Sequence, residues 1–263
     1  MSRSRYWLWI LLAVLCCGAC RQSSVQTEKA GIAISFDDRF IADWHNLRPL
    51  LNEYQARVTF YITGDTLSDI ELSMLRDLAS DGHEIGFHGT VHGNARELVA
   101  DHGPDGYLGI EIRPGLDFLR KKGFNPTTYA HPGGTRSGRS DSVLFANGFV
   151  TLREVSKAER YLGGIRLYHI PPAWMPHIYY DFDHRSTLFA LQIDRETELS
   201  EDEMSSALEK AKTEGKVLML FGHQPLPENP APEQYGFRVD FLRYILQEAH
   251  ARGLHFYTMS ELQ

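Results

Sequence analysis

A regular alternation of short apolar runs and longer amphipathic stretches restricts the fold of this chain more than any other feature. From Gly31 onward, strand-like apolar runs occupy residues 32–36, 58–62, 84–87, 128–130, 149–152, 186–193, 217–221 and 255–258, and helical periodicity occupies residues 44–54, 68–80, 108–122, 200–213 and 237–251. Repeated strand–helix units of this length predict an α/β fold with a mainly parallel sheet and helices outside it. Residues 162–184, rich in Pro and aromatic side chains, are predicted to be an irregular excursion from one domain that spans residues 31–263.

The first twenty residues have the composition of a secretory signal. Arg3 and Arg5 precede an almost wholly apolar run at 6–17, which is shorter than the ~20 residues of a comfortable membrane span. The three cysteines are Cys16, Cys17 and Cys20, so cleavage before Cys20 leaves one thiol and no disulfide framework. The segment resembles a bacterial lipoprotein signal, although Cys17 stands where Leu is usual. This resemblance implies a signal peptide at 1–19, lipidation of Cys20, a polar tether at 20–30 and an extracytoplasmic location on a bacterial cell membrane; an uncleaved anchor helix is the alternative.

The charge of the chain restricts its partners. The sequence has 27 basic and 34 acidic residues and a formal net charge of -7, whereas a nucleic-acid-binding protein needs a basic surface to contact phosphates. We therefore expect no nucleic-acid partner. The hydrophobic content of 43% is ordinary for a globular protein with a core, and we expect a monomer.

Two adjacent carboxylates, Asp37 and Asp38, follow the first predicted strand. In parallel α/β folds the carboxyl ends of the strands are where active sites gather. Asp also favours turns and helix N-caps, so the pair alone does not establish a site. It gains meaning only if other reactive side chains follow strands at the same edge.

Three histidines meet that condition. His88 and His92 directly follow the predicted strand 84–87, and residues at i and i+4 on one helical turn can reach the same ion. With Asp38 they make a set of two imidazoles and one carboxylate, which leaves coordination positions open for water and substrate. His223 follows the strand 217–221 and is expected at the same end of the sheet, although a loop histidine there can also be purely structural.

The order of these groups resembles that of the polysaccharide deacetylases of the NodB-homology type, carbohydrate esterase family four. The family motifs are Phe-Asp-Asp, His-(Ser/Thr)-x-x-His and Leu-x-x-His; here they read Phe36-Asp37-Asp38, His88-Gly89-Thr90-Val91-His92 and Leu220-Phe221-Gly222-His223. The resemblance covers nearly all of residues 31–263. It implies a single distorted, incomplete (β/α) barrel that carries the catalytic site.

The resemblance also implies a role for each residue. Asp37 is the general base, Asp38, His88 and His92 bind one divalent metal ion, and His223 is the general acid that protonates the leaving amine. The chemistry agrees, because amide hydrolysis needs a polarised carbonyl, an activated water and a protonated leaving group. The family favours Zn²⁺, although Co²⁺, Ni²⁺, Fe²⁺ and Mn²⁺ accept the same kinds of ligand.

The third motif departs from the family pattern. Where the family commonly has Arg-x-Pro-Tyr, this chain has Ala130-His131-Pro132-Gly133, so the active-site Arg is expected to be absent. The backbone N–H of Gly133 is expected to serve the oxyanion, which needs no side chain, and His131 to shape the groove wall. The altered third motif leaves the identity of the substrate open, but it does not change the expected class of reaction.

Two smaller departures concern the second and fourth motifs. Gly89 replaces a Ser/Thr whose hydroxyl steadies the loop in the family. The chain has no clear Asp-x-x-Asp-Trp segment, in which an Asp helps orient the active-site Arg of family members. Arg153 and Glu154 are the nearest candidates by position.

These observations together predict a metal-dependent hydrolase that removes N-acetyl groups from the amino sugars of an extracytoplasmic polysaccharide or peptidoglycan. One alternative keeps the metal site but acts on another small amide or ester. The other is an inactive scaffold that binds carbohydrate, for which Trp174, Tyr179 and Tyr180 could stack on sugar rings or simply pack in the core. Fold alone does not separate these functions, but the retained acid, base and ligands favour the deacetylase.

Overall fold

The computed structural model describes residues 29–263 apart from residues 164 and 232. The predicted signal peptide, Cys20 and residues 20–28 of the predicted tether lie outside the described residues. Within the part of the chain that is described, none of the helices combines the length and apolar character needed to cross a bilayer.

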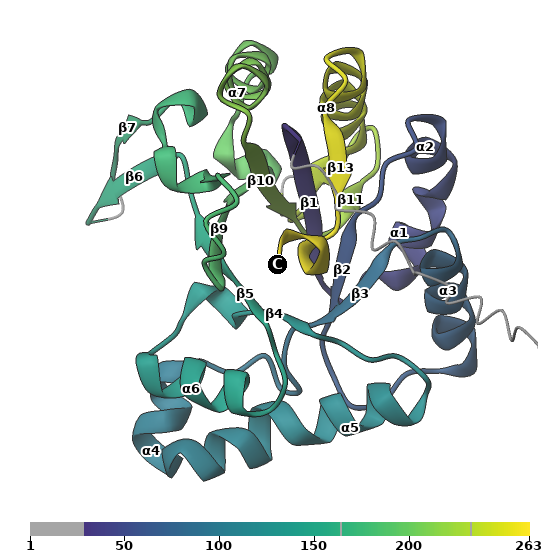
Figure 1. Cartoon of the computed structure of the whole chain (residues 1–263), viewed down its shortest axis with the longest axis vertical. Coiled ribbons are helices and arrows are strands. Elements are labelled where there is room, and N and C mark those ends of the chain that lie inside the picture. The colour runs from purple at the N-terminus through teal and green to yellow at the C-terminus, as the bar shows by residue number, and fades with distance from the viewer. Residues whose placement is uncertain (1–28, 164, 232) are drawn as a thin grey trace, which may run out of the picture.

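Seven parallel strands form a closed barrel within residues 29–263. They are β1 (Gly31–Asp38), β2 (Thr59–Ile62), β3 (Glu84–Phe87), β4 (Thr128–Ala130), β5 (Thr151–Ser156), β9 (Thr187–Gln192) and β10 (Val217–Gly222), and β10 pairs with β1 to close the sheet. Figure 1 shows the strands in the middle of the molecule with the helices around them. The incomplete (β/α) barrel expected from the sequence is confirmed.

Helices connect most of these strands. They are α1 (Ile41–Asn46), α2 (Arg48–Glu53), α3 (Asp69–Ser80), α4 (Ala95–Tyr107), α5 (Arg113–Lys121), α6 (Gly138–Ala146), α7 (Glu201–Glu214) and α8 (Val239–Ala251), with a π-helical turn, η1 (Leu108–Ile112), between α4 and α5. Capping boxes at Ser68 and Ser200 begin α3 and α7 where the sequence predicts helices. The sequence did not predict α4, whose helical pattern Gly103 and Pro104 interrupt, or α6.

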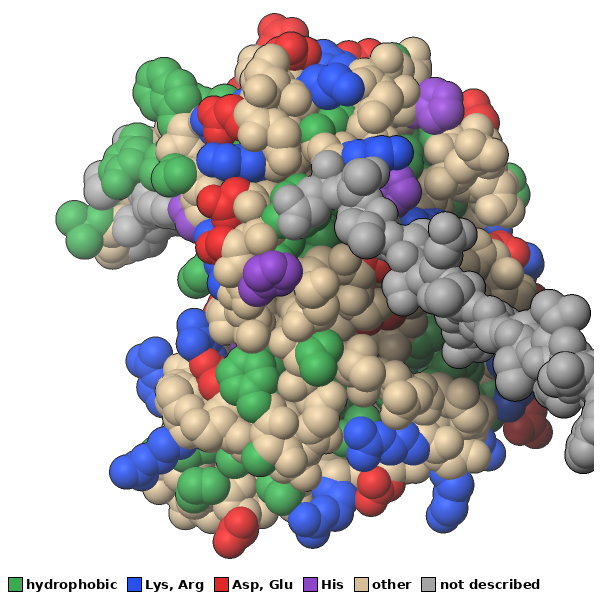
Figure 2. Space-filling model, viewed as in Figure 1, with side chains coloured by type: hydrophobic (Ala, Val, Ile, Leu, Met, Phe, Trp, Pro, Cys, Tyr) green, Lys and Arg blue, Asp and Glu red, His purple; other side chains and the backbone are tan. Residues whose placement is uncertain are grey.

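Short strands complete the sheets. β13 (His255–Tyr257) pairs with the first half of β1, and β8 (Tyr179–Tyr180) is antiparallel to β10; β11 (Pro225–Leu226) and β12 (Phe237–Arg238) form a separate parallel pair. β6 (Glu159–Leu162) and β7 (Ile165–His169) form an antiparallel hairpin that projects from the barrel (Figure 1). Apolar side chains gather on this projection (Figure 2), including exposed Leu162 and Ile165. The prediction that residues 162–184 are irregular is therefore wrong for β7 and β8.

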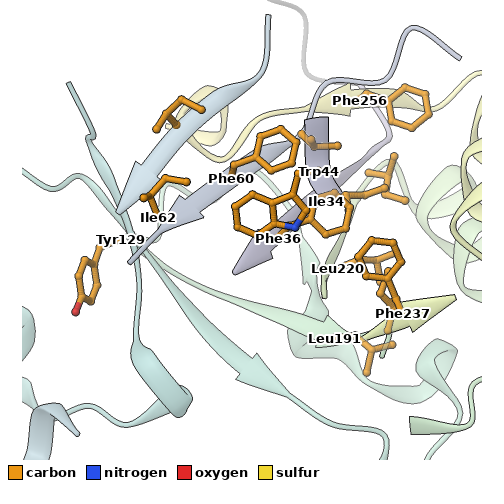
Figure 3. Close-up of a cluster of buried hydrophobic side chains, with 14 of the residues drawn as sticks. Ile34, Phe36, Trp44, Phe60, Ile62, Tyr129, Leu191, Leu220, Phe237 and Phe256 are labelled. Carbon is orange, nitrogen blue, oxygen red and sulfur yellow. The ribbon is translucent and has the colours of Figure 1, made fainter. Parts of the chain in front are cut away.

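The alternation of side chains along the strands produces two cores. Ile32, Ile34 and Phe36 of β1 face the helices, where Phe36 stacks on Phe60 with ring centroids 5.7 Å apart (Figure 3). Ala33 faces the barrel interior. Because side chains alternate with a period of two, Asp37 lies on the inner side of β1, where it is 2% exposed.

The carboxyl-terminal turn η6 (Met259–Leu262) closes one end of the barrel. Met259 and Leu262 pack into the inner core, and Figure 1 shows this turn over the middle of the barrel. Tyr179 and Tyr180 are also buried, so the suggestion that they stack on sugar rings is wrong, whereas Trp174 is 77% exposed.

Candidate active site

A pocket of about 250 Å³ lies at the carboxyl end of the barrel strands. Its lining includes every catalytic, wall and metal-binding residue predicted from the sequence: Asp37, Asp38, His88, His92, His131, Gly133 and His223. These residues come from the ends of β1, β3, β4 and β10, so the parallel barrel itself brings them together.

Asp38, His88 and His92 have the geometry of a metal site. The Oδ1 atom of Asp38 lies 3.5 Å from Nε2 of His88 and 3.4 Å from Nε2 of His92. Zinc bonds of about 2.0–2.1 Å at tetrahedral angles place ligand atoms about 3.4 Å apart. The three residues also form a group whose ligand atoms all lie within 4.8 Å of one another. The spacing therefore fits one small divalent ion.

The tautomer and charge of His88 fit the same role. Its Nδ1 lies 2.8 Å from the backbone oxygen of Ala130, which can only accept, so Nδ1 carries the hydrogen and Nε2 presents a lone pair towards Asp38. Burial lowers the pKa of His88 to about 3. The ring is thus neutral at pH 7, as a metal ligand must be.

The loop between the two histidines differs from the predicted helical turn. Residues 88–93 are not helical, and both Gly89 (φ +85°) and His92 (φ +55°) have left-handed backbone conformations. The two rings nevertheless lie with centroids 5.0 Å apart. The histidines converge because the loop bends between them, and its backbone must therefore be held in place by other groups.

Asp37 is buried beside a positive charge. Arg153 on β5 is completely buried, and its Nη2 donates to Oδ2 of Asp37. Burial alone raises the pKa of Asp37, but the charge of Arg153, with smaller contributions from His88 and His223, outweighs it and holds that pKa below its ordinary value. Asp37 is therefore ionised at neutral pH, which a general base requires.

The position of Arg153 corrects two expectations. The active-site arginine expected to be absent is present, because Arg153 enters the site from the strand next to Ala130; the two residues are register partners in the β4–β5 ladder. Arg153 lies within β5, not after a strand, and its guanidinium carbon is 4.3 Å from the ring centroid of Phe221. Arg153 and Glu154, the nearest candidates by position for the fourth motif, both lie within β5, and Arg153 contacts Asp37 instead of taking the place of an acid.

Asp194 supports His223. The Nδ1 atom of His223 lies 2.6 Å from Oδ2 of Asp194, and the backbone N–H of His223 donates to Oδ1 at 3.1 Å. Burial lowers the pKa of His223, but the hydrogen bond and charge of Asp194 outweigh it and raise that pKa. The shift favours the protonated ring, the form that a general acid requires. Asp194 was not predicted from the sequence, although it lies just beyond β9, at a strand end like the other site residues.

Replacing Asp194 by Asn should move the alkaline limb of the pH–rate profile to lower pH. Because Asp194 raises the pKa of His223, the protonated ring persists to higher pH in the wild type and is lost sooner without that charge. We expect kcat near pH 8 to fall at least ~10-fold, part of the 10²–10⁴ that a positioned acid contributes. Rates measured from about pH 5 to 9 test this, and an unchanged alkaline limb would show that another group controls it.

The third motif forms one wall of the pocket. His131 is fully buried, with Nε2 3.2 Å from Oδ1 of Asp141, and burial lowers its pKa. Gly133 has a left-handed backbone (φ +59°), a conformation that favours glycine, and a Cβ added there would meet no atom within 4 Å. The wall is therefore open where the family commonly has Tyr. The oxyanion role of Gly133 stays a prediction.

Comparison with known proteins agrees with this arrangement. The family model described as polysaccharide deacetylase matches residues 24–149, which contain both aspartates, His88 and His92 but end before His223. No curated protein matches the sequence.

Several solved structures are similar over most of the chain. The peptidoglycan deacetylase PdaC from Bacillus subtilis is 16% identical, with 89% of this chain and 90% of that chain covered and a TM-score of 0.54. The chitin deacetylase from Colletotrichum lindemuthianum is 13% identical over 90% and 88%, with a TM-score of 0.56. A putative polysaccharide deacetylase from Mycobacterium smegmatis is 18% identical over 91% of both chains, with a TM-score of 0.55. At these identities the likeness shows a shared fold.

Proposed function

Because residues 24–149 belong to the polysaccharide deacetylase family and the described chain has the fold of such enzymes, we propose that this protein is a metal-dependent hydrolase that removes N-acetyl groups from the amino sugars of an extracytoplasmic polysaccharide or peptidoglycan. The family and the enzyme class predicted from the sequence are confirmed by this match.

One observation carries the proposal. A single pocket holds a set of candidate ligands for a divalent ion, an ionised carboxylate and a histidine whose pKa is raised by a second carboxylate. These are the parts that hydrolysis of an unactivated amide requires. A scaffold that only binds carbohydrate would need neither the Arg153–Asp37 pair nor the Asp194–His223 pair.

The proposed reaction assigns one proton transfer to each pair. Asp37 takes a proton from the attacking water as the water oxygen adds to the acetamide carbon. The backbone N–H of Gly133 donates a hydrogen bond to the oxyanion that develops. His223 then gives its proton to the nitrogen as the C–N bond breaks, which yields acetate and a free amine. A metal ion held by Asp38, His88 and His92 would polarise the carbonyl and lower the pKa of water.

Acetate release from acetylated chito-oligosaccharides tests this function. A soluble form that begins near Val25, loaded with zinc, should release acetate, and its Asp37→Asn variant should not. If the wild-type protein binds one metal ion per chain but releases no acetate, the open wall at Gly133 favours assays with other small amides and esters.

The proposed location rests on the N-terminal sequence. Cys20→Ser should move the protein from the membrane fraction to the soluble fraction or leave its signal unprocessed, because the cysteine that would carry the lipid at the predicted cleavage site is then absent. Cys16→Ser, which lies before the three residues that precede the predicted cleavage site, is the matched control and should fractionate as the wild type does. Normal processing and membrane attachment of Cys20→Ser would exclude lipid at this cysteine.

A further inference from the structure

The metal loop, residues 88–93, has Gly89 where the family motif usually has a Ser or Thr hydroxyl, yet it must hold His92. The side chain of His92 is 45% exposed, so packing fixes it less firmly than His88, which is 2% exposed. Its place beside Asp38 therefore depends on the backbone of residues 89–93, which has left-handed conformations at Gly89 and His92. Some group outside the loop has to stabilise this backbone.

Glu111 is in contact with the loop at three positions. It is 0% exposed and lies in η1, the π-helical turn between α4 and α5. Its Oε2 accepts from the N–H of Val91 and its Oε1 from the N–H of Gly93, both at 3.1 Å, and its backbone oxygen accepts from the N–H of Thr90 at 2.8 Å. The two carboxylate bonds are on either side of His92, so they restrict the segment that carries this ligand.

The absence of a side chain at residue 89 matches this arrangement. A Cβ placed on Gly89 would lie 1.8 Å from Oε1 and 2.8 Å from the carboxyl carbon of Glu111. The carboxylate therefore occupies the space that a Ser or Thr side chain would need. The position of the Glu111 carboxylate therefore requires glycine at residue 89.

We propose that Glu111 is a positioning residue for the metal site, which holds the backbone of the 89–93 loop so that His92 is preorganised to bind the ion; this rests on the proposed metal-dependent function. The two carboxyl oxygens accept from backbone N–H groups on either side of His92, so one side chain fixes both ends of the segment that carries this ligand. π-Helical turns such as η1 occur frequently at functional sites, and this one brings Glu111 under the loop. Preorganisation lowers the cost of ordering His92 when the ion binds.

Zinc affinity of the full chain, measured by competition with a chelator, tests the proposal. Glu111→Gln keeps the volume but replaces one accepting oxygen with a donating NH₂ group, which then faces a backbone N–H. We expect zinc to bind about 10- to 100-fold more weakly, the usual effect of losing a group that orients a ligand. In the metal-free protein, amide hydrogen exchange at Val91 and Gly93 should become faster than in the wild type.

Glu84→Gln is the matched control. Glu84 also accepts several hydrogen bonds at a largely buried place, from Thr59, Thr128 and Ser260, but it lies at the start of β3, whereas His88 follows its end. This variant should lose stability without losing zinc affinity. If Glu111→Gln does not fold, Glu111→Asp replaces it, because the shorter side chain keeps the carboxyl group but cannot reach both N–H groups.

The possible results separate this inference from the proposed function. Wild-type zinc affinity in a folded Glu111 variant, or an equal loss in Glu84→Gln, overturns the positioning role. A wild-type protein that binds zinc but releases no acetate contradicts the proposed reaction, and the comparison of zinc affinities still decides the role of Glu111. A wild-type protein that does not bind zinc overturns both.

Discussion

Asp37→Asn should abolish measurable turnover while the protein keeps nearly all of its metal. The Asn side chain cannot take a proton from the attacking water, and a general base contributes a factor of about 10²–10⁴ to the rate of such a reaction. The metal should stay because Asp38, not Asp37, has the oxygen that lies within 3.5 Å of both histidine Nε2 atoms; the Oδ2 of Asp37 is 3.9 Å from His88. Acetate release and metal content, measured on the same preparation, check the two halves of this prediction.

Substitutions of the proposed metal ligands should behave differently from Asp37→Asn. Asp38→Asn and His92→Ala should lose metal and activity together, since each removes one of the three ligands. If Asp38→Asn kept full metal occupancy, the ligand assignment would be wrong. Asp37→Asn also leaves Arg153 buried without its partner, which can cost about 3–5 kcal/mol. Thermal unfolding therefore has to show that the variant is folded at the assay temperature.

The residues that could be predicted from the sequence are those at strand ends. Asp37, Asp38, His88 and His223 each follow an apolar run, and in a parallel barrel all such positions share one edge. Asp194 also lies beyond the end of a strand, but a lone acid after a strand is common at turns, so nothing in the sequence distinguished it. Its role depends on β9 lying next to β10.

The residues that could not be predicted act from the interior of an element. Arg153 lies within β5 and is visible as a site residue only once the β4–β5 register places it beside Ala130. Glu111 lies in a helical region, where a charged residue normally faces solvent, and only the π-helical turn and the bend of the metal loop bring it to Val91 and Gly93. Long-range packing, which local periodicity does not encode, decides both cases.

Arg153→Met should reduce kcat by about 10²-fold and destabilise the protein by about 3–5 kcal/mol at neutral pH. Met keeps most of the volume against Phe221 but removes the charge, so burial raises the pKa of Asp37 unopposed by its main partner. Because the wild-type pKa of Asp37 is below its ordinary value, the ion pair stabilises the fold above the ordinary Asp range and ceases to do so as pH falls through the folded pKa. The difference in unfolding free energy between variant and wild type should therefore shrink in acid, which denaturant titrations at two pH values can measure.

Moving the arginine from residue 153 on β5 to residue 130 on the neighbouring strand β4 separates the electrostatic role of Arg153 from its packing role. Ala130 is fully buried in the inner core and pairs with Arg153 across the β4–β5 ladder, so Arg153→Ala leaves space for a guanidinium that starts from residue 130. The double variant Arg153→Ala with Ala130→Arg should regain part of the kcat and stability that Arg153→Ala loses, whereas Ala130→Arg alone should overpack the barrel and destabilise it. If the double variant is no more active than Arg153→Ala, Asp37 needs the particular geometry of an arginine on β5. Recovery would show that the requirement is a buried positive charge beside the base, which either of two adjacent strands can supply.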